Sequence, residues 1–112
     1  ELARGAGCTV ELDWRAVPLL AGVRDLAARG FVTGASGRNW AGYGHDVVLA
    51  DGFAAEDRAL LTDPQTSGGL LVSCLPSALD DVLKAFRRHG FDQAAVVGRV
   101  AAKGAAPRLH VG

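Results

Sequence analysis

The stretch from residue 63 to residue 72, DPQTSGGLLV, restricts the possible folds of this chain more than any other. Asp63-Pro64 predicts the end of a preceding helix, because proline disfavours helical geometry at the residue before it and has no N–H of its own. Two glycines then stand directly before Leu70-Leu71-Val72, an apolar run that is typical of a buried strand. We therefore expect a sharp turn at the entrance to a core strand.

The same stretch supports two interpretations. Glycines without a Cβ let consecutive backbone N–H groups point into one concavity, and the hydroxyls of Thr66 and Ser67 add donors, so a phosphate group would fit there. The alternative is a turn that binds nothing, because a Gly-Gly pair before a strand is a common turn signal. Asp63 would either orient these donors or a Mg²⁺ ion, or simply form an Asx-type turn. The residues alone leave both interpretations open.

The string Asp63-Pro64-Gln65-Thr66-Ser67-Gly68-Gly69-Leu70-Leu71 resembles a signature near the C-terminal end of the selenophosphate synthetases, also called selenide, water dikinases. That family belongs to a larger group of ATP-using enzymes that includes aminoimidazole ribonucleotide synthetase. The resemblance extends to segments 1–7, 18–22, 34–39 and 96–100. It covers only the C-terminal domain of the family, so we expect residues 1–112 to form a single C-terminal domain without the N-terminal ATP-binding and catalytic domain. The absence of methionine, including at position 1, leads us to expect either a piece of a longer protein or a processed product.

A glycine-rich segment, residues 31–46, carries four glycines, at positions 34, 37, 42 and 44. A segment of this composition is hard to pack as core, so we expect a surface loop or an ordered binding loop. Its spacing fits neither the dinucleotide-binding fingerprint nor a Walker A motif. In the resemblance, Arg38-Asn39 matches an Arg-Asn pair of the family, although Ala35 and Gly37 depart from the family pattern. The alternative for this pair is a helix cap or a loop at a domain interface.

The resemblance implies ATP-dependent formation of selenophosphate from selenide, with AMP and phosphate as the other products, in a cytoplasmic homodimer. Phosphoryl transfer of this kind uses Mg²⁺ to offset the polyphosphate charge. The metal-binding aspartates and the reactive cysteine or selenocysteine of the family lie upstream of Glu1, which implies that this fragment alone is inactive and holds no catalytic residue and no metal ligand. Its implied role is to complete the nucleotide cleft, with contacts from Thr66, Ser67, Gly68, Gly69, Arg38 and Asn39.

Two alternatives remain beside this interpretation. The chain would be the C-terminal domain of another ATP-dependent enzyme of the aminoimidazole ribonucleotide synthetase superfamily, or a non-catalytic domain for packing and dimerisation. Twelve basic and 12 acidic residues give no formal net charge, so nothing favours nucleic acid or an anionic membrane as partner. The apolar stretches are also much shorter than the roughly 20 residues of a membrane span.

Cysteine and histidine residues give no sign of a metal site. Cys8 and Cys74 lie in apolar surroundings without metal-binding spacing, so we expect two buried free thiols. The histidines at positions 45, 89 and 110 share no ligand spacing. No Gly-x-Ser-x-Gly elbow is present that would make Ser67 a hydrolase nucleophile.

The hydrophobic pattern predicts alternating strands and helices. Strands are expected at 8–13, 47–50, 70–75, 94–100 and 108–111, and helices at 1–4, 18–29, 54–62 and 79–89. Gly98 indicates a bulge or a close backbone approach within its strand. A turn over residues 103–107 would join the last two strands as a hairpin. We therefore expect an α+β fold with a mixed or antiparallel sheet and helices packed on one face.

Overall fold

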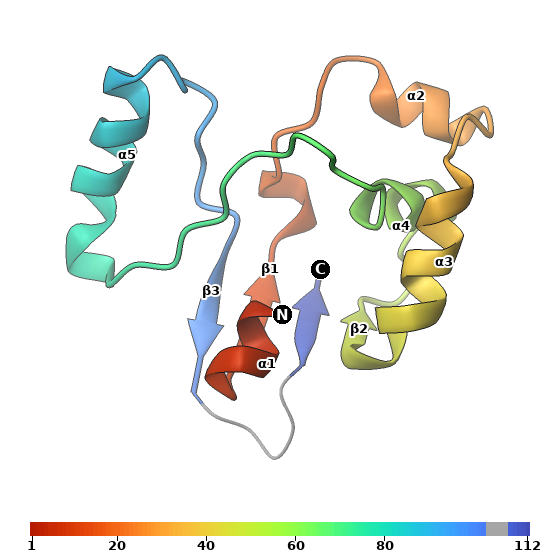
Figure 1. Ribbon diagram of the computed structural model, residues 1–112, viewed down its shortest axis with the longest axis horizontal. Coiled ribbons are helices and arrows are strands. Elements are labelled where there is room, and N and C mark those ends of the chain that lie inside the picture. Colours follow the sequence, from red (N-terminus) through yellow and green to blue (C-terminus); the bar gives the residue numbers. More distant parts are fainter. Residues whose placement is uncertain (103–107) are drawn as a thin grey trace.

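The computed structural model describes residues 1–102 and 108–112 and shows helices around a four-stranded sheet (Figure 1). The strands are β1 (Thr9–Leu12), β2 (Val47–Leu49), β3 (Gly98–Ala101) and β4 (Leu109–Val111). The α-helices are α1 (Leu2–Ala6), α2 (Val23–Ala28), α3 (Gly34–Tyr43), α4 (Ala55–Leu61) and α5 (Leu79–Arg88), and short 3₁₀ helices cover Trp14–Ala16, Gly44–Asp46 and Pro76–Ala78. The predicted α+β class with a mixed sheet is confirmed, whereas the turn predicted over residues 103–107 lies outside the described residues.

The sheet has the strand order β2-β4-β1-β3. Strand β1 runs parallel to β4 and antiparallel to β3, and β4 runs parallel to β2. The predicted hairpin between the last two strands is wrong, because β1 lies between them and pairs with both. Pairing along both edges satisfies the backbone N–H and C=O groups of β1, and β3 and β4 are not paired with each other in the described sheet.

Gly98 is the residue at which β3 joins the sheet. It lies opposite Leu12, and a Cβ built on it would overlap the backbone carbonyl of Glu11. The close backbone approach that the sequence indicated at this glycine is therefore confirmed. The strand starts here and not at Ala94 as expected, because its partner β1 ends at Leu12.

A small set of side chains forms the core beside the sheet. The ring of Trp14 packs against that of Phe53, with 6.1 Å between ring centroids. The backbone N–H of Trp14 donates to the carbonyl of Gly112 at 2.8 Å, which fixes the end of β1 to the end of β4. The buried apolar residues are Cys8, Trp14, Ala27 and Val111.

The strand predicted at residues 70–75 is wrong. These residues have no regular structure, and Leu70 is 82% exposed. No backbone N–H from Gln65 to Ser77 donates to a backbone carbonyl within the described parts of the chain. The apolar run has strand composition but pairs with none of the four described strands, and composition alone does not satisfy backbone groups. The same fact explains why Cys74, expected to be buried, is exposed, whereas Cys8 is buried as predicted.

Helix α2 is shorter than the predicted helix 18–29. Gly22 adopts φ 81°, a left-handed conformation that cannot continue a helix, so the helix begins only at Val23. It ends before Gly30, whose φ of 86° confirms the predicted stop. Arg24 of α2 forms an ion pair with Asp57 of α4 at 2.9 Å and links these two helices.

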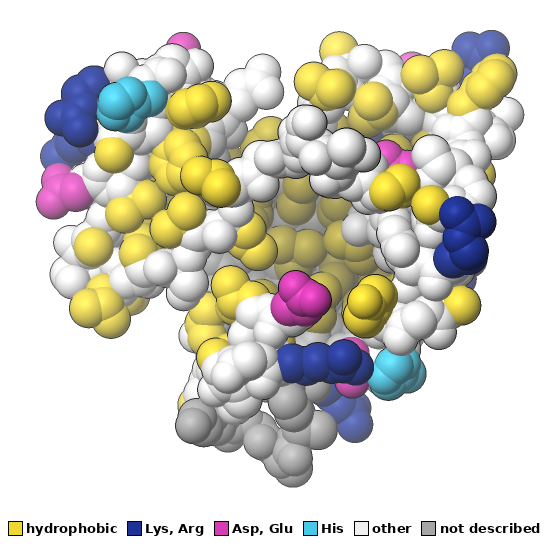
Figure 2. Space-filling view, viewed as in Figure 1, with side chains coloured by type: hydrophobic (Ala, Val, Ile, Leu, Met, Phe, Trp, Pro, Cys, Tyr) yellow, Lys and Arg dark blue, Asp and Glu magenta, His cyan; other side chains and the backbone are white. Residues whose placement is uncertain are grey.

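The helices gather around an open face of the molecule. In Figure 1, α1 lies in front of β1, α2 to α4 lie together on one side and α5 lies on the other. Figure 2 shows this face hollowed in the middle, with apolar side chains on its floor. Several large apolar side chains remain largely exposed, among them Leu20, Phe31, Leu70, Leu71, Leu75 and Phe91.

Candidate functional site

Helix α3 forms in the segment that its glycines led us to predict as a loop, so that prediction is wrong. Thr33 caps the helix, because its hydroxyl accepts a hydrogen bond from the backbone N–H of Ser36 at 3.3 Å. Farther along, the guanidinium of Arg58 from α4 lies 5.2 Å from the ring centroid of Trp40. The cap and the cross-helix contact compensate for glycines that disfavour a helix.

A polar cluster joins α3 to the last turn of α4. The Ser36 side chain is buried and its hydroxyl donates to the carbonyl of Ala59 at 2.8 Å. The same hydroxyl lies 2.7 Å from the hydroxyl of Thr62. The amide nitrogen of Asn39 donates to the backbone carbonyl of Thr62 at 2.9 Å. Because residues three apart share one helix face, Ser36 and Asn39 both form hydrogen bonds with the C-terminal end of α4.

The next residue, Asp63, connects this cluster to the glycine-containing turn. Its carboxylate accepts a hydrogen bond from the hydroxyl of Thr33 at 3.0 Å and a longer one from the amide of Gln65 at 3.4 Å. The cap residue of α3 is therefore also a contact for the first residue of segment 63–69. The carboxylate of Asp63, at the start of segment 63–69, is therefore held by Thr33 before α3 and by Gln65 within the segment.

Within segment 63–69, residues 64–69 are exposed, and the two glycines differ in their surroundings. A Cβ on Gly68 would lie 2.8 Å from the Cβ of Gln65, so any larger residue would clash at this position. A Cβ on Gly69 would meet nothing within 4 Å. Neither glycine has a positive φ, so the alternating right- and left-handed residues of an anion-binding nest are not formed here. The segment does offer backbone N–H groups that donate to no backbone carbonyl of residues 1–102 and 108–112, beside the hydroxyls of Thr66 and Ser67.

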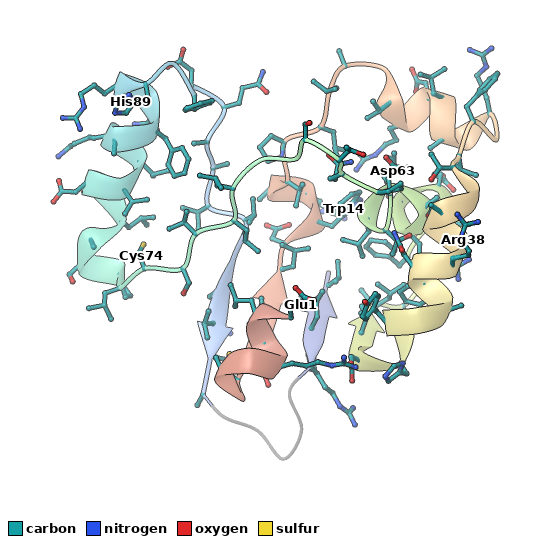
Figure 3. The ribbon with its side chains drawn as sticks, viewed as in Figure 1. Glu1, Trp14, Arg38, Asp63, Cys74 and His89 are labelled. Atoms are coloured by element: carbon teal, nitrogen blue, oxygen red, sulfur yellow. The ribbon has the colours of Figure 1, made fainter. Side chains whose placement is uncertain are left out.

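The structure separates the predicted pair Arg38 and Asn39. Asn39 lies on the face of α3 that contacts α4, and its amide nitrogen is engaged by Thr62. Arg38 is exposed and extends along the outer flank of the helix, whereas Asp63 lies on the inner side (Figure 3). Of the two, only Asn39 is brought to the start of segment 63–69.

Sequence reasoning missed Thr33, Ser36 and Thr62. The cap had a visible signal, because a threonine stands three residues before Ser36 at the start of a helix. The Ser36–Thr62 contact had none, since it joins residues 26 positions apart on two helices. A pocket of about 410 Å³ lies between α2, α3 and α4 and is lined in part by Thr33, Ser36, Trp40, Arg58 and Thr62.

Other kinds of site were sought among residues 1–102 and 108–112. These residues bring no three His, Cys, Asp or Glu side chains together as a metal site. None of their helices has the length and apolar character needed to cross a membrane. A hollow of about 750 Å³ lies along the carboxyl ends of β1, β2 and β4, and none of the predicted site residues lines it.

Comparison with known proteins relates the chain to one family of domains. Residues 1–108 match the model of the AIR synthase related protein, C-terminal domain. The chain is 63% identical over 100 residues to the selenide, water dikinase of Burkholderia pseudomallei, an alignment that covers 89% of this chain and 28% of that protein. It is 53% identical over all 112 residues to the selenide, water dikinase of Pseudomonas straminea, where it covers 31% of the relative. The chain thus spans about three-tenths of the length of these relatives.

Proposed function

The chain belongs to the family of AIR synthase related protein C-terminal domains, and from this premise we propose that it is the C-terminal domain of a selenide, water dikinase. The full-length enzyme would make selenophosphate from selenide and ATP and release AMP and phosphate. The observation that carries this proposal is the 63% identity to a protein of that name over 89% of the chain. The predicted fragment character is supported by the exposed apolar side chains, because surfaces of this kind mark contacts with further protein.

The role proposed for this chain is to contribute to the nucleotide cleft. Thr66, Ser67, Gly68 and Gly69 would contact phosphate through hydroxyl and backbone N–H groups that have no hydrogen-bond partner among the described residues. The donor set fits an anionic group, since each of these groups donates to a phosphate oxygen. Arg38 is proposed as a further contact because its guanidinium is exposed, and Asn39 as a residue of the same site.

Mg²⁺ would be bound with ATP mainly by residues outside this chain, where it offsets polyphosphate charge. The single domain of residues 1–112 would be inactive alone. We further propose that the full-length enzyme is a cytoplasmic homodimer with ATP and selenide as its substrates, and that it uses neither a membrane nor nucleic acid as partner.

A second candidate is a non-catalytic domain for packing and dimerisation. It is favoured by the surroundings of Gly68, where a Cβ would lie 2.8 Å from the Cβ of Gln65, so that packing alone favours glycine at this position. Segment 63–69 would then serve as a turn only.

The experiment that tests the proposal measures selenide-dependent AMP formation from ATP by the full-length protein and by this 112-residue chain in parallel. AMP from the full-length protein and none from the chain is the expected result. If the folded full-length protein forms no selenide-dependent AMP, the assignment as a selenide, water dikinase is contradicted. The remaining assignment would then be another ATP-dependent enzyme of the aminoimidazole ribonucleotide synthetase superfamily.

A further inference from the structure

We infer that Ser36 and Asn39 are positioning residues that hold the start of segment 63–69 in place for its proposed contact with nucleotide phosphate. The inference rests on the proposed function in one respect, because it assumes that segment 63–69 contacts nucleotide phosphate. Its physical basis, however, is the polar cluster between α3 and α4, which does not depend on any ligand. Both residues would act through Thr62 and Asp63 and not by touching the substrate.

The first argument is that segment 63–69 has few other supports. After Asp63, the next backbone N–H that donates to a backbone carbonyl is that of Ala78, within the described residues. The side-chain contact between Gln65 and Asp63 is internal to the segment, and Leu70 beyond it is 82% exposed. The position of residues 64–69 is therefore set mainly by the place where the chain leaves α4.

The second argument is that the hydrogen bonds from α3 converge on this exit. Ser36 contacts the carbonyl of Ala59 and the hydroxyl of Thr62, and Asn39 contacts the carbonyl of Thr62. The last carbonyls of a helix have no partner within the helix, so side chains that donate to them fix its final turn. Ser36 is only 4% exposed, so water cannot readily replace its hydrogen bonds.

The third argument concerns Asn39 itself. The Asn39 amide nitrogen donates one of its two N–H groups to the carbonyl of Thr62 at 2.9 Å, so part of its hydrogen-bonding capacity is used within the chain. Positioning of segment 63–69 accounts for this residue without a direct contact to the nucleotide.

The test uses Asn39→Asp and Ser36→Ala in the full-length protein. Asn39→Asp keeps the side-chain shape but turns an acceptor toward the Thr62 carbonyl, and Ser36→Ala removes the buried hydroxyl. Ala41→Ser, an exposed change on the same helix, is the matched control. Folding of every variant is confirmed by circular dichroism before any other measurement.

The first readout is amide hydrogen exchange at Thr62 and Asp63 without ligand. These amides donate to the carbonyls of Arg58 and Leu60 at 3.2 Å, so loosening the last turn of α4 exposes them. We expect exchange to become about tenfold faster in both variants and to stay unchanged in the control, as the loss of one or two hydrogen bonds implies. Unchanged exchange in both variants would overturn the inference whether or not the protein forms selenophosphate.

The second readout separates positioning from mere stability. The KM for ATP should rise about fivefold to tenfold in folded Asn39→Asp, with a smaller change in kcat, because a displaced segment weakens phosphate binding. Combined with Ser67→Ala, the effects on KM should be less than additive, since a displaced segment has already weakened the contact made by Ser67. Additive effects, or an unchanged KM, would contradict positioning, whereas absence of selenide-dependent AMP from the unmodified protein would contradict the proposed function instead.

Discussion

The backbone of Gly98 in β3 passes so close to the carbonyl oxygen of Glu11 in β1 that no Cβ fits between them. The neighbouring side chains confirm the register, since the guanidinium of Arg99 lies 2.6 Å from the Glu11 carboxylate. Gly98 is thus required at the point where the outer strand β3 joins β1.

Replacement of this glycine should weaken the sheet. Gly98→Ala forces the two strands apart, and we expect a loss of about 2 kcal/mol or more in the free energy of unfolding. Gly5→Ala in α1 is the matched control, because its Cβ would meet nothing within 4 Å. Urea denaturation followed by circular dichroism measures both; equal stability of the two variants would show that the strand contact tolerates a methyl group.

Glycines in α3 and in the 3₁₀ helix that follows it should respond to substitution in opposite directions. Gly37→Ala and Gly42→Ala place a methyl group in open space within a helix, so each should stabilise the chain by about 0.5 to 1 kcal/mol. Gly44→Ala should destabilise it, because the new Cβ would lie 2.8 Å from the ring of Trp40. Thermal unfolding of the three variants tests this, and a destabilising Gly37→Ala would speak against a helical α3.

Substitutions in segment 63–69 distinguish binding from packing. Gly69→Val should leave folding intact, because its Cβ has free space, but should lower selenide-dependent turnover of the full-length protein if the backbone contacts phosphate. Ser67→Ala should raise the KM for ATP about tenfold or less, the range expected for one lost hydrogen bond. Gly68→Ala is a poor probe, since it collides with Gln65 whatever the function. Normal turnover by both Gly69→Val and Ser67→Ala would favour the packing role.

The two cysteines should differ in reactivity. Cys74 is exposed and should react with a thiol reagent in the folded 112-residue chain, whereas Cys8 is 6% exposed and should react only after unfolding. Mass spectrometry after timed alkylation, with and without urea, counts the modified sites. Protection of Cys74 in the folded chain would mean that segment 70–75 is covered.

Local signals predicted several elements well. The alternation in Cys8–Asp13 predicted β1, and the acidic first turn of residues 54–62 predicted α4. Asp63-Pro64 correctly predicted the end of α4. The amphipathic pattern from Leu79 gave α5, which stops at Gly90 with φ 84°. Each of these depends on residues near one another in sequence, where periodicity and glycine conformation act directly.

The predictions from sequence were wrong where contacts between residues far apart in the chain determine the local structure. Helix α3 forms in a glycine-rich segment because Arg58 and Ala59 of α4, and Thr62 directly after it, provide partners that local propensity does not contain. Segment 70–75 has strand composition, but it pairs with no strand in the part of the chain that the structure describes. For the site, the sequence indicated Asp63 to Gly69 but not Ser36, whose buried hydroxyl contacts residues more than 20 positions away.

The sequence alone determined the α+β class, the resemblance carried by residues 63–71, and the C-terminal ends of α2, α4 and α5. These features depend on local backbone chemistry and on an exact string. Only the tertiary structure decided that β1 lies between β3 and β4, that Asn39 and not Arg38 reaches the end of α4, and that Gly69 has free space while Gly68 does not. The physical reason is that hydrogen bonds and close contacts between distant segments must satisfy buried polar groups, and which partners meet is settled only when the chain has packed.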